Sequence, residues 1–110
     1  MVTFTARRSN VEMVTPARPI PWETKTLSDK DDHPGHLVYI PLVEFFRCRA
    51  GHVRAQKDPA KVVMVALVEA LVWYYPVASR LWEVAEGKLV VECTAEGVAF
   101  VEADADVRLE

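Results

Sequence analysis

Residues 58–76 contain a helix whose two ends are marked in the sequence, and this helix limits how the chain can fold. Asp58 can accept a hydrogen bond from an unpaired helix N–H, and Pro59 has a φ angle suited to the first helical turn. Pro76 disfavours the helical conformation at Tyr75. The sequence therefore predicts a helix from Pro59 to about Tyr74, with a further helical turn at residues 78–82.

The predicted helix is apolar around most of its circumference. Its expected core-facing stripe consists of Val62, Val63, Ala66, Leu67, Ala70, Leu71 and Tyr74. The opposite face holds Met64, Val65, Val68 and Val72, with only Lys61 and Glu69 charged. Three explanations stay open for this second face. It packs on another part of the chain, it is a docking surface for a protein partner, or it has drifted in a chain no longer selected for solubility.

Several segments outside the helix have the composition of strands or connectors. Residues 2–5 alternate apolar and polar side chains and predict a short first strand, whereas the three prolines of residues 16–21 predict an extended connector. Residues 27–32 predict a polar turn. Residues 37–46 are rich in Val, Ile, Tyr and Phe, so they predict a strand buried on both faces. Pro41 favours an edge position or a bulge for that strand.

Two further β-rich runs follow the helix, at residues 88–93 and 98–103. The four residues between them include Gly97, and this spacing predicts a β-hairpin. With residues 49–57 expected to form a loop, the elements predict an α+β fold. We expect a partial two-layer sandwich, with one main helix packed on a mixed or antiparallel sheet. A chain of 110 residues can form one small core but not two.

The charge and cysteine content exclude several classes of function. The formal net charge is −3, from 13 basic and 16 acidic residues, so nucleic acid is not an expected partner. A membrane is not expected either, because the apolar run is short and contains Glu69. Cys48 and Cys93 have no metal-ligand or disulfide spacing and are expected to be free thiols. Without an apolar leader at its start, the chain is expected to be cytoplasmic.

No catalytic or metal-binding set can be assembled from the residues alone. The three histidines are His33, His36 and His52, and none is followed four residues later by an aspartate. His33 and His36 flank a Pro-Gly pair, which is more typical of a turn than of a metal site. The sequence therefore predicts no catalytic residue, no metal ligand and no bound cofactor.

The order and spacing of several elements nevertheless resemble the BAHD family of acyl-CoA-dependent acyltransferases. The matching elements are residues 4–8, the proline connector, LSDKDD at 27–32, residues 41–47, the helix ending in YYPVASRL at 74–81, and GKLVVECTAEGVAFVEADADV at 87–107. The chain is most similar to the subgroup related to the benzyl alcohol benzoyltransferases of plants. It departs from the family pattern at Ser79 and Trp82, and at Met64, Val65 and Val68 in the helix.

The resemblance implies a fold and a reaction. Residues 1–110 would form a single partial domain, the start of a chloramphenicol-acetyltransferase-like fold. Members of the family, which serve plant specialised metabolism, transfer an acyl group from acyl-CoA, their co-substrate, to a small alcohol or amine acceptor. The histidine of an HxxxD motif removes the proton of the acceptor. The 110 residues contain neither HxxxD nor DFGWG, so the chain is expected to be a truncated fragment that is inactive alone.

The resemblance also implies candidate substrate-binding residues and an alternative function. By position in the family, Leu42 and Glu44 would contribute to the acceptor end of the active-site tunnel, although ordinary sheet packing gives the same alternation. The alternative is a non-catalytic binding or regulatory module. Such a module would dock on a full-length relative, or associate with itself, through the apolar helix face.

Overall fold

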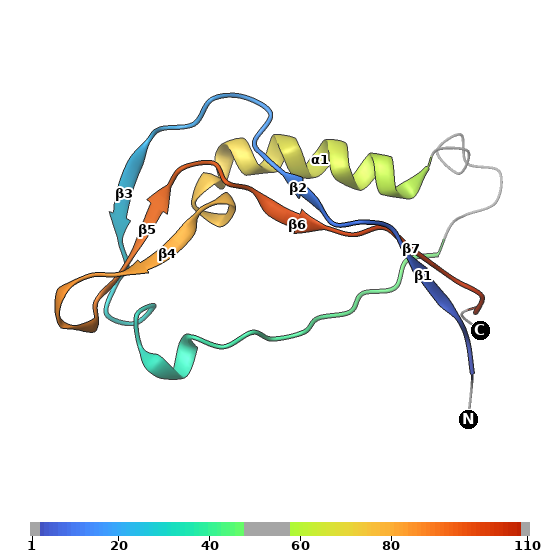
Figure 1. Cartoon of the computed structure of the whole chain (residues 1–110), viewed down its shortest axis with the longest axis horizontal. Coiled ribbons are helices and arrows are strands. Elements are labelled where there is room, and N and C mark those ends of the chain that lie inside the picture. Colours follow the sequence, from blue (N-terminus) through green and yellow to red (C-terminus); the bar gives the residue numbers. More distant parts are fainter. Residues whose placement is uncertain (1–2, 48–57, 109–110) are drawn as a thin grey trace.

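The computed structural model describes residues 3–47 and 58–108, and within them the chain has an α+β architecture (Figure 1). The strands form three small antiparallel sheets. The pairs are β1 (Ala6–Arg8) with β7 (Ala103–Ala105) and β2 (Glu12–Val14) with β6 (Val98–Phe100). The third sheet has the order β3 (Glu23–Thr26), β5 (Leu89–Cys93), β4 (Arg80–Glu83).

The long helix α1 (Pro59–Trp73) confirms the prediction made from its end signals. The Asp58 carboxylate accepts a hydrogen bond of 3.0 Å from the backbone N–H of Ala60, as an N-cap does. The helical turn predicted at residues 78–82 is wrong. The short 3₁₀ helix η3 (Tyr75–Ala78) is followed by Ser79, whose extended backbone leads directly into β4.

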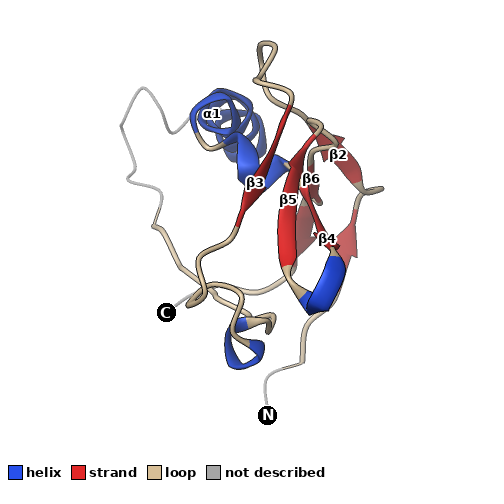
Figure 2. Ribbon diagram, turned by 90° about the vertical axis from the view of Figure 1, so that its left-hand side faces the viewer, coloured by secondary structure: helices blue, strands red, loops and turns tan. Residues whose placement is uncertain are grey.

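One face of α1 packs against the sheet formed by β2 and β6, and it shares only Leu67 and Leu71 with the predicted stripe. Leu71 is buried with Val14 and Ala78, and the partly buried residues around them are Met64, Leu67, Val68, Val98 and Phe100. Val62 and Val63, which were expected to face the core, are 50% and 55% exposed. Because apolar residues surround the helix, their spacing cannot select the packed face. Figure 2 shows α1 beside the strands.

The hairpin predicted from residues 88–93 and 98–103 is wrong, although strands form at both places. β5 pairs with β3 on one edge and with β4 on the other, so it has no free edge for β6. Between the two strands Ala95 and Gly97 have positive φ angles of 56° and 96°, which turn the chain toward β2. The backbone N–H of Gly97 also donates to the carbonyl oxygen of Ala78 over 2.8 Å.

Two other strand predictions also fail. The first strand begins at Ala6, after the predicted residues 2–5, of which residue 2 lies outside the described part. Residues 37–46 are not a strand, because none of the described residues pairs with them. The loop predicted at residues 49–57 lies outside the described residues.

The proline connector is fastened to the middle of α1. The guanidinium of Arg18 donates two hydrogen bonds, of 2.7 and 2.8 Å, to the Glu69 carboxylate. One residue earlier, the backbone N–H of Ala17 donates to the carbonyl oxygen of Val68 over 2.9 Å. The paired guanidinium lowers the pKa of Glu69, and the carboxylate raises the pKa of Arg18.

The Arg18–Glu69 pair predicts a small pH dependence of stability. Since the pKa of Glu69 is lower in the folded chain, its contribution is present above the ordinary glutamate pKa and is lost as the pH falls through the lowered value. We expect Arg18→Gln to remove this contribution in urea unfolding curves measured across acidic pH. The loss should be small and should shrink in high salt, because both side chains are about half exposed. Arg8→Gln, at a residue with no ion pair among the described residues, is the control and should leave the profile unchanged.

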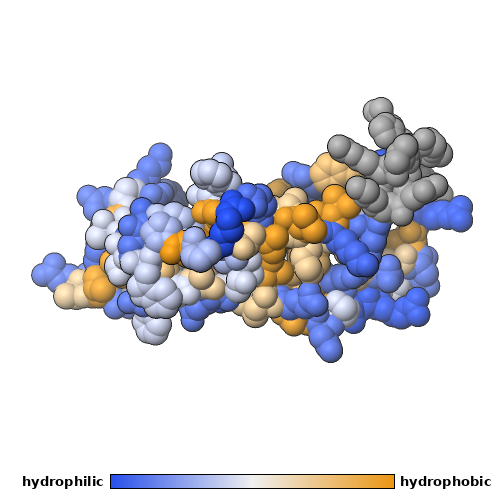
Figure 3. Space-filling model, turned by 90° about the horizontal axis from the view of Figure 1, so that it is seen from above, coloured by the Kyte–Doolittle hydropathy of each residue, from blue (hydrophilic) through white to orange (hydrophobic). Residues whose placement is uncertain are grey.

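The buried core is small for the length of the chain. The buried hydrophobic residues in the described part are Val14, Leu71, Ala78, Val90, Val91 and Cys93. The radius of gyration is 18.0 Å, whereas a compact domain of this length has about 13 Å. Figure 3 shows hydrophobic side chains in the middle of the face seen from above, where α1 lies in Figure 1. No helix in the described ranges is both long and apolar enough to cross a membrane.

Candidate functional site

Leu42 and Glu44, the two residues that the sequence proposes for substrate binding, lie on an extended segment, residues 38–47, which follows the short 3₁₀ helix η1 (Pro34–His36). In Figure 1 the extended segment runs along the lower side of the molecule, from η1 to the region below β1 and β7. Both residues are exposed, and Leu42 is 82% exposed. No described residue forms a hydrogen bond or ion pair with the Glu44 carboxylate.

An apolar cavity of about 350 Å³ lies where the extended segment begins. It is lined by His36, Leu37, Val38, Tyr39, Leu81 and Leu89. The first four come from the end of η1 and the start of the extended segment, while Leu81 and Leu89 come from β4 and β5. No carboxylate lines the cavity, so its chemistry suits a small uncharged group with an apolar body.

His36 and Tyr39 are the titratable side chains among the residues that line this cavity. The His36 ring nitrogen Nδ1 lies 2.7 Å from the carbonyl oxygen of Lys30. A carbonyl can only accept a hydrogen bond, so Nδ1 carries the proton, and in the neutral ring Nε2 is an acceptor. His36 can thus accept a hydrogen bond from a hydroxyl group, and among the described residues no carboxylate forms a hydrogen bond or ion pair with its ring.

The turn at residues 27–32 is held against the start of β5, and this contact positions the cavity. Lys88 Nζ lies 2.9 Å from Asp29 Oδ1 and 3.2 Å from Asp32 Oδ2. The backbone N–H of Leu89 donates to Asp32 Oδ1 over 3.1 Å. Asp29 raises the pKa of Lys88, and Lys88 lowers the pKa of Asp29.

A second polar cluster holds β3 against η3. The Tyr75 hydroxyl donates to the Glu23 carboxylate, which also pairs with Lys25 at 3.0 Å. The Lys25 ammonium lies 5.6 Å from the centre of the Tyr75 ring. The hydrogen bond to Glu23 raises the pKa of Tyr75, and the same bond lowers the pKa of Glu23. With its hydroxyl donating to a carboxylate and its pKa raised, Tyr75 serves to attach the strand and is not an activated nucleophile.

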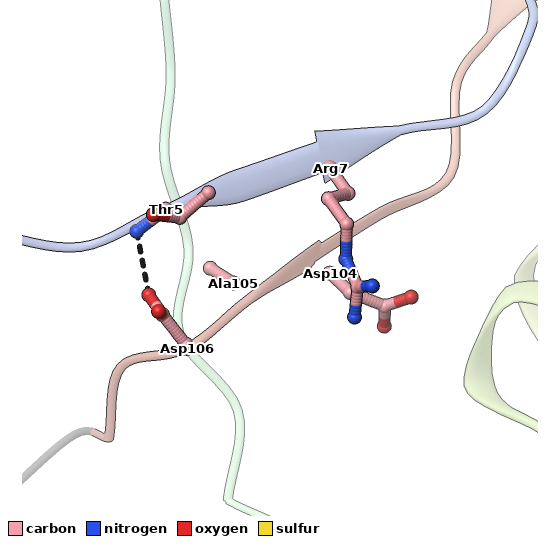
Figure 4. A pocket seen from close by; sticks show the side chains of 5 residues that line it. All are labelled: Thr5, Arg7, Asp104, Ala105 and Asp106. Atoms are coloured by element: carbon pink, nitrogen blue, oxygen red, sulfur yellow. Dashed lines mark hydrogen bonds between the residues drawn. The ribbon is translucent and has the colours of Figure 1, made fainter.

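A polar cavity of about 380 Å³ lies beside β1 and β7 (Figure 4). Arg7 and Asp104 are direct partners in the strand register, so they share one face of this sheet. Asp106 accepts a hydrogen bond from the backbone N–H of Thr5. The cavity therefore contains charges of both signs and one carboxylate that already holds the strand end, which gives it no selectivity for a ligand of one charge.

The two described histidines are not placed as metal ligands. His33 Nδ1 accepts a hydrogen bond of 3.1 Å from the backbone N–H of Gly35, and its ring centre is 5.5 Å from that of His36. Residues 3–47 and 58–108 contain no cluster of three potential metal-ligating side chains. Cys93 is fully buried, while Cys48 and His52 lie outside the described residues.

Sequence reasoning missed the cavity and the contacts that position it. His36, Leu81 and Leu89 are distant in the sequence, and no motif links them. The acidic residues at 27–32 predict a polar turn and match the family pattern, but they do not indicate Lys88 as their partner, because the pairing of β3 with β5 brings it near. Of the two residues that were proposed, Leu42 and Glu44, neither lines a cavity described above.

Comparison with known proteins gives a consistent set of relatives. The model of the Transferase family matches residues 1–110. The chain is 60% identical to Acyl transferase 1 of Oryza sativa subsp. japonica over all of this chain and 24% of that protein. It is 50% identical to the Benzyl alcohol O-benzoyltransferase of Petunia hybrida and 52% identical to Spermidine hydroxycinnamoyltransferase 1 of rice. These matches cover 99% and 94% of this chain, and 23% and 24% of the relatives. The chain thus spans about a quarter of the length of the curated relatives that it matches.

Proposed function

Because the chain belongs to the Transferase family, the BAHD acyltransferases, we propose that it forms part of an enzyme that transfers an acyl group from acyl-CoA to an alcohol or amine. The observation that carries this proposal is the 60% identity to a rice acyl transferase over the whole chain. The other relatives support both acceptor classes, since one is named for benzyl alcohol and another for spermidine.

The chemistry of acyl transfer explains why the 110 residues alone should be inactive. The acceptor must lose a proton as it attacks the thioester carbon, and a positioned base speeds this step by about 10²–10⁴-fold. The sequence contains no HxxxD motif, and the hydrogen-bond partner of the His36 ring is the Lys30 carbonyl oxygen and not a carboxylate. We propose that the base is supplied by a part of the enzyme that this chain does not span.

We propose that this chain contributes part of the fold and part of the site that binds the acceptor. In this proposal residues 1–110 are one partial domain, the start of a chloramphenicol-acetyltransferase-like fold, in the cytoplasm. Leu42 and Glu44 would face the acceptor. The apolar cavity around Leu81 and Leu89, at the start of the same extended segment, supports an acceptor with an apolar body.

A chimera tests the proposal. The chain would replace the matched quarter of the Petunia benzoyltransferase, and release of CoA thiol from benzoyl-CoA would be measured with benzyl alcohol. We expect the chimera to transfer the acyl group. The isolated 110-residue chain should be at least about 100-fold slower, because it lacks the base. The unchanged Petunia protein is the positive control. A chimera that folds but does not form benzyl benzoate would contradict the proposal.

A second candidate function has one observation in its favour. Val62, Val63 and Val65 on α1 are all at least half exposed, so the chain could dock on a full-length relative or on itself as a regulatory module. Light scattering and a pull-down with the Petunia protein would test it. A monomeric chain that does not bind the relative would exclude this candidate.

A further inference from the structure

A further cavity, of about 300 Å³, lies between α1 and the junction of two strand ladders, β1–β7 and β2–β6 (Figure 1). We call it the junction cavity, and it is lined by Ser9, Asn10, Glu12, Met64, Phe100 and Glu102. Met64 belongs to α1, and the other five belong to the ladders or to the short connections between them. The acyl-transfer proposal makes no use of this cavity.

A β-bulge at the junction places the cavity. The register on either side of it is given by two pairs, Arg8 with Ala103 and Glu12 with Phe100. Between these pairs three residues of one strand, 9–11, oppose two of the other, 101–102. A bulge of this kind interrupts the ladder and bends the strand, and it is a common device for redirecting side chains beside a site.

Two carboxylates line the junction cavity without a partner. Glu12 and Glu102 are both exposed, and neither carboxylate forms an ion pair or a hydrogen bond with any residue in the ranges 3–47 and 58–108. Glu12 lies directly opposite Phe100 in the register, and Glu102 is two residues farther along. Residues in such a diagonal relation are about 7–8 Å apart. The amide oxygen of Asn10 adds a hydrogen-bond acceptor between them in sequence.

The floor of the junction cavity is apolar. Met64 and Phe100 are partly buried, and both pack against the buried cluster that contains Val14 and Leu71. A methionine side chain adapts its shape to a ligand, and a phenylalanine ring attracts a cation to its face. The cavity therefore combines two negative groups with an apolar surface that can contact methylene groups.

This combination selects among classes of ligand. Calcium binds about six to eight oxygen ligands and magnesium requires an octahedral set, whereas the described residues contain no cluster of three potential metal-ligating side chains. A metal ion would also leave the apolar floor uncovered. Two carboxylates, in a chain of net charge −3, repel anions. An organic cation uses both the carboxylates and the floor.

We propose that the junction cavity binds an aliphatic diamine or polyamine whose ammonium groups are separated by three or four methylene groups. This spacing places the two nitrogens about 5–6 Å apart, so each can reach one carboxylate of a diagonal pair. One ammonium pairs with Glu12 and the other with Glu102, while the methylene groups lie on Met64 and Phe100. The proposal does not rest on the acyl-transfer function, and either can fail without the other.

An NMR titration of the 110-residue chain with 1,4-diaminobutane tests the site. We expect saturable binding with a Kd on the order of 1 mM at low salt, weaker at high salt, with shifted amide signals confined to residues 9–12, 62–66 and 99–103. Butylamine has the same apolar body with one charge, and Mg²⁺ has two charges without an apolar body. Each should bind at least about threefold more weakly. Equal binding of either one, or shifts spread over the whole chain, would overturn the proposal.

Charge-removing variants locate the binding groups. Glu12→Gln and Glu102→Gln should each raise the Kd for 1,4-diaminobutane by about two- to fivefold, as expected for exposed ion pairs. Glu83→Gln is the matched control, since it removes the same charge from an exposed strand residue outside the cavity. It should leave the Kd unchanged. An equal loss for all three variants would reduce the binding to general attraction by the net charge and would reject the site. Unchanged circular dichroism spectra would show that the variants keep the fold.

Discussion

Gly97→Ala should destabilise the chain by about 4 kcal/mol, because the substitution combines backbone strain with a steric clash. The φ angle of Gly97 is +96°, which alanine rarely adopts. A Cβ atom at this position would lie 2.6 Å from the carbonyl oxygen and 3.0 Å from the carbonyl carbon of Val14, which are backbone atoms of β2. Urea unfolding followed by circular dichroism measures the effect.

Gly87→Ala is the matched control for Gly97→Ala. Gly87 also has a positive φ angle, of +74°, but a Cβ atom there would lie 3.6 Å from its nearest contact, Glu83 Oε1. Strain without a clash should cost about 1 kcal/mol. Equal effects of the two substitutions would show that β2 moves away from Gly97 without loss, and would contradict the close approach seen here.

Leu71→Ala should destabilise the chain by about 2–5 kcal/mol, since it opens a cavity between α1 and the sheet of β2 and β6. Leu71 is 2% exposed and lies in the buried cluster with Val14 and Ala78. A core this small has few other contacts to compensate, so urea unfolding should show the loss both in the midpoint and in the free energy of unfolding.

Val65→Ala on the same helix is the control for Leu71→Ala. Val65 is 68% exposed, so its truncation should change stability by about 0.5 kcal/mol or less. A larger loss at Val65 than at Leu71 would show that α1 packs through its other face in solution.

Local signals in the sequence were sufficient for the helix. Asp58, Pro59 and Pro76 affect the backbone only within one or two helical turns of their own positions. They indicate where the helix begins and ends, and α1 runs from Pro59 to Trp73. The choice of the packed face could not be predicted, because Val62 and Val63 are as apolar as Leu67 and Val68. That choice depends on where β2 and β6 lie.

Strand partners were less predictable than strands. β5 and β6 occur close to where β-rich composition placed them, but their pairing to each other was wrong. β5 cannot pair with β6 because β3 and β4 occupy its two edges. The sequence of residues 88–103 alone does not indicate that these edges are occupied. The strand predicted at residues 37–46 was wrong, because composition alone does not supply a pairing partner and none of the described residues pairs with this segment.

The candidate site was predicted only through family resemblance. The family itself is confirmed by the match over residues 1–110. The role of Leu42 and Glu44 stays a prediction. The apolar cavity could not be predicted, because its walls come from four separate parts of the chain: η1, the extended segment, β4 and β5. The contact that holds these parts together, between Lys88 and Asp29, joins residues nearly 60 positions apart.

The sheet register has a consequence for synthesis on the ribosome. The strands β1, β2 and β3 lie in the first quarter of the chain, and each pairs with a strand in the last quarter. The pairs include Ala6 with Ala105, Glu12 with Phe100 and Glu23 with Cys93. During translation α1 can form as soon as it emerges, whereas β1, β2 and β3 must remain unpaired until synthesis has nearly reached Glu110. Chaperones that bind nascent polypeptides would therefore meet these early strands before any sheet exists.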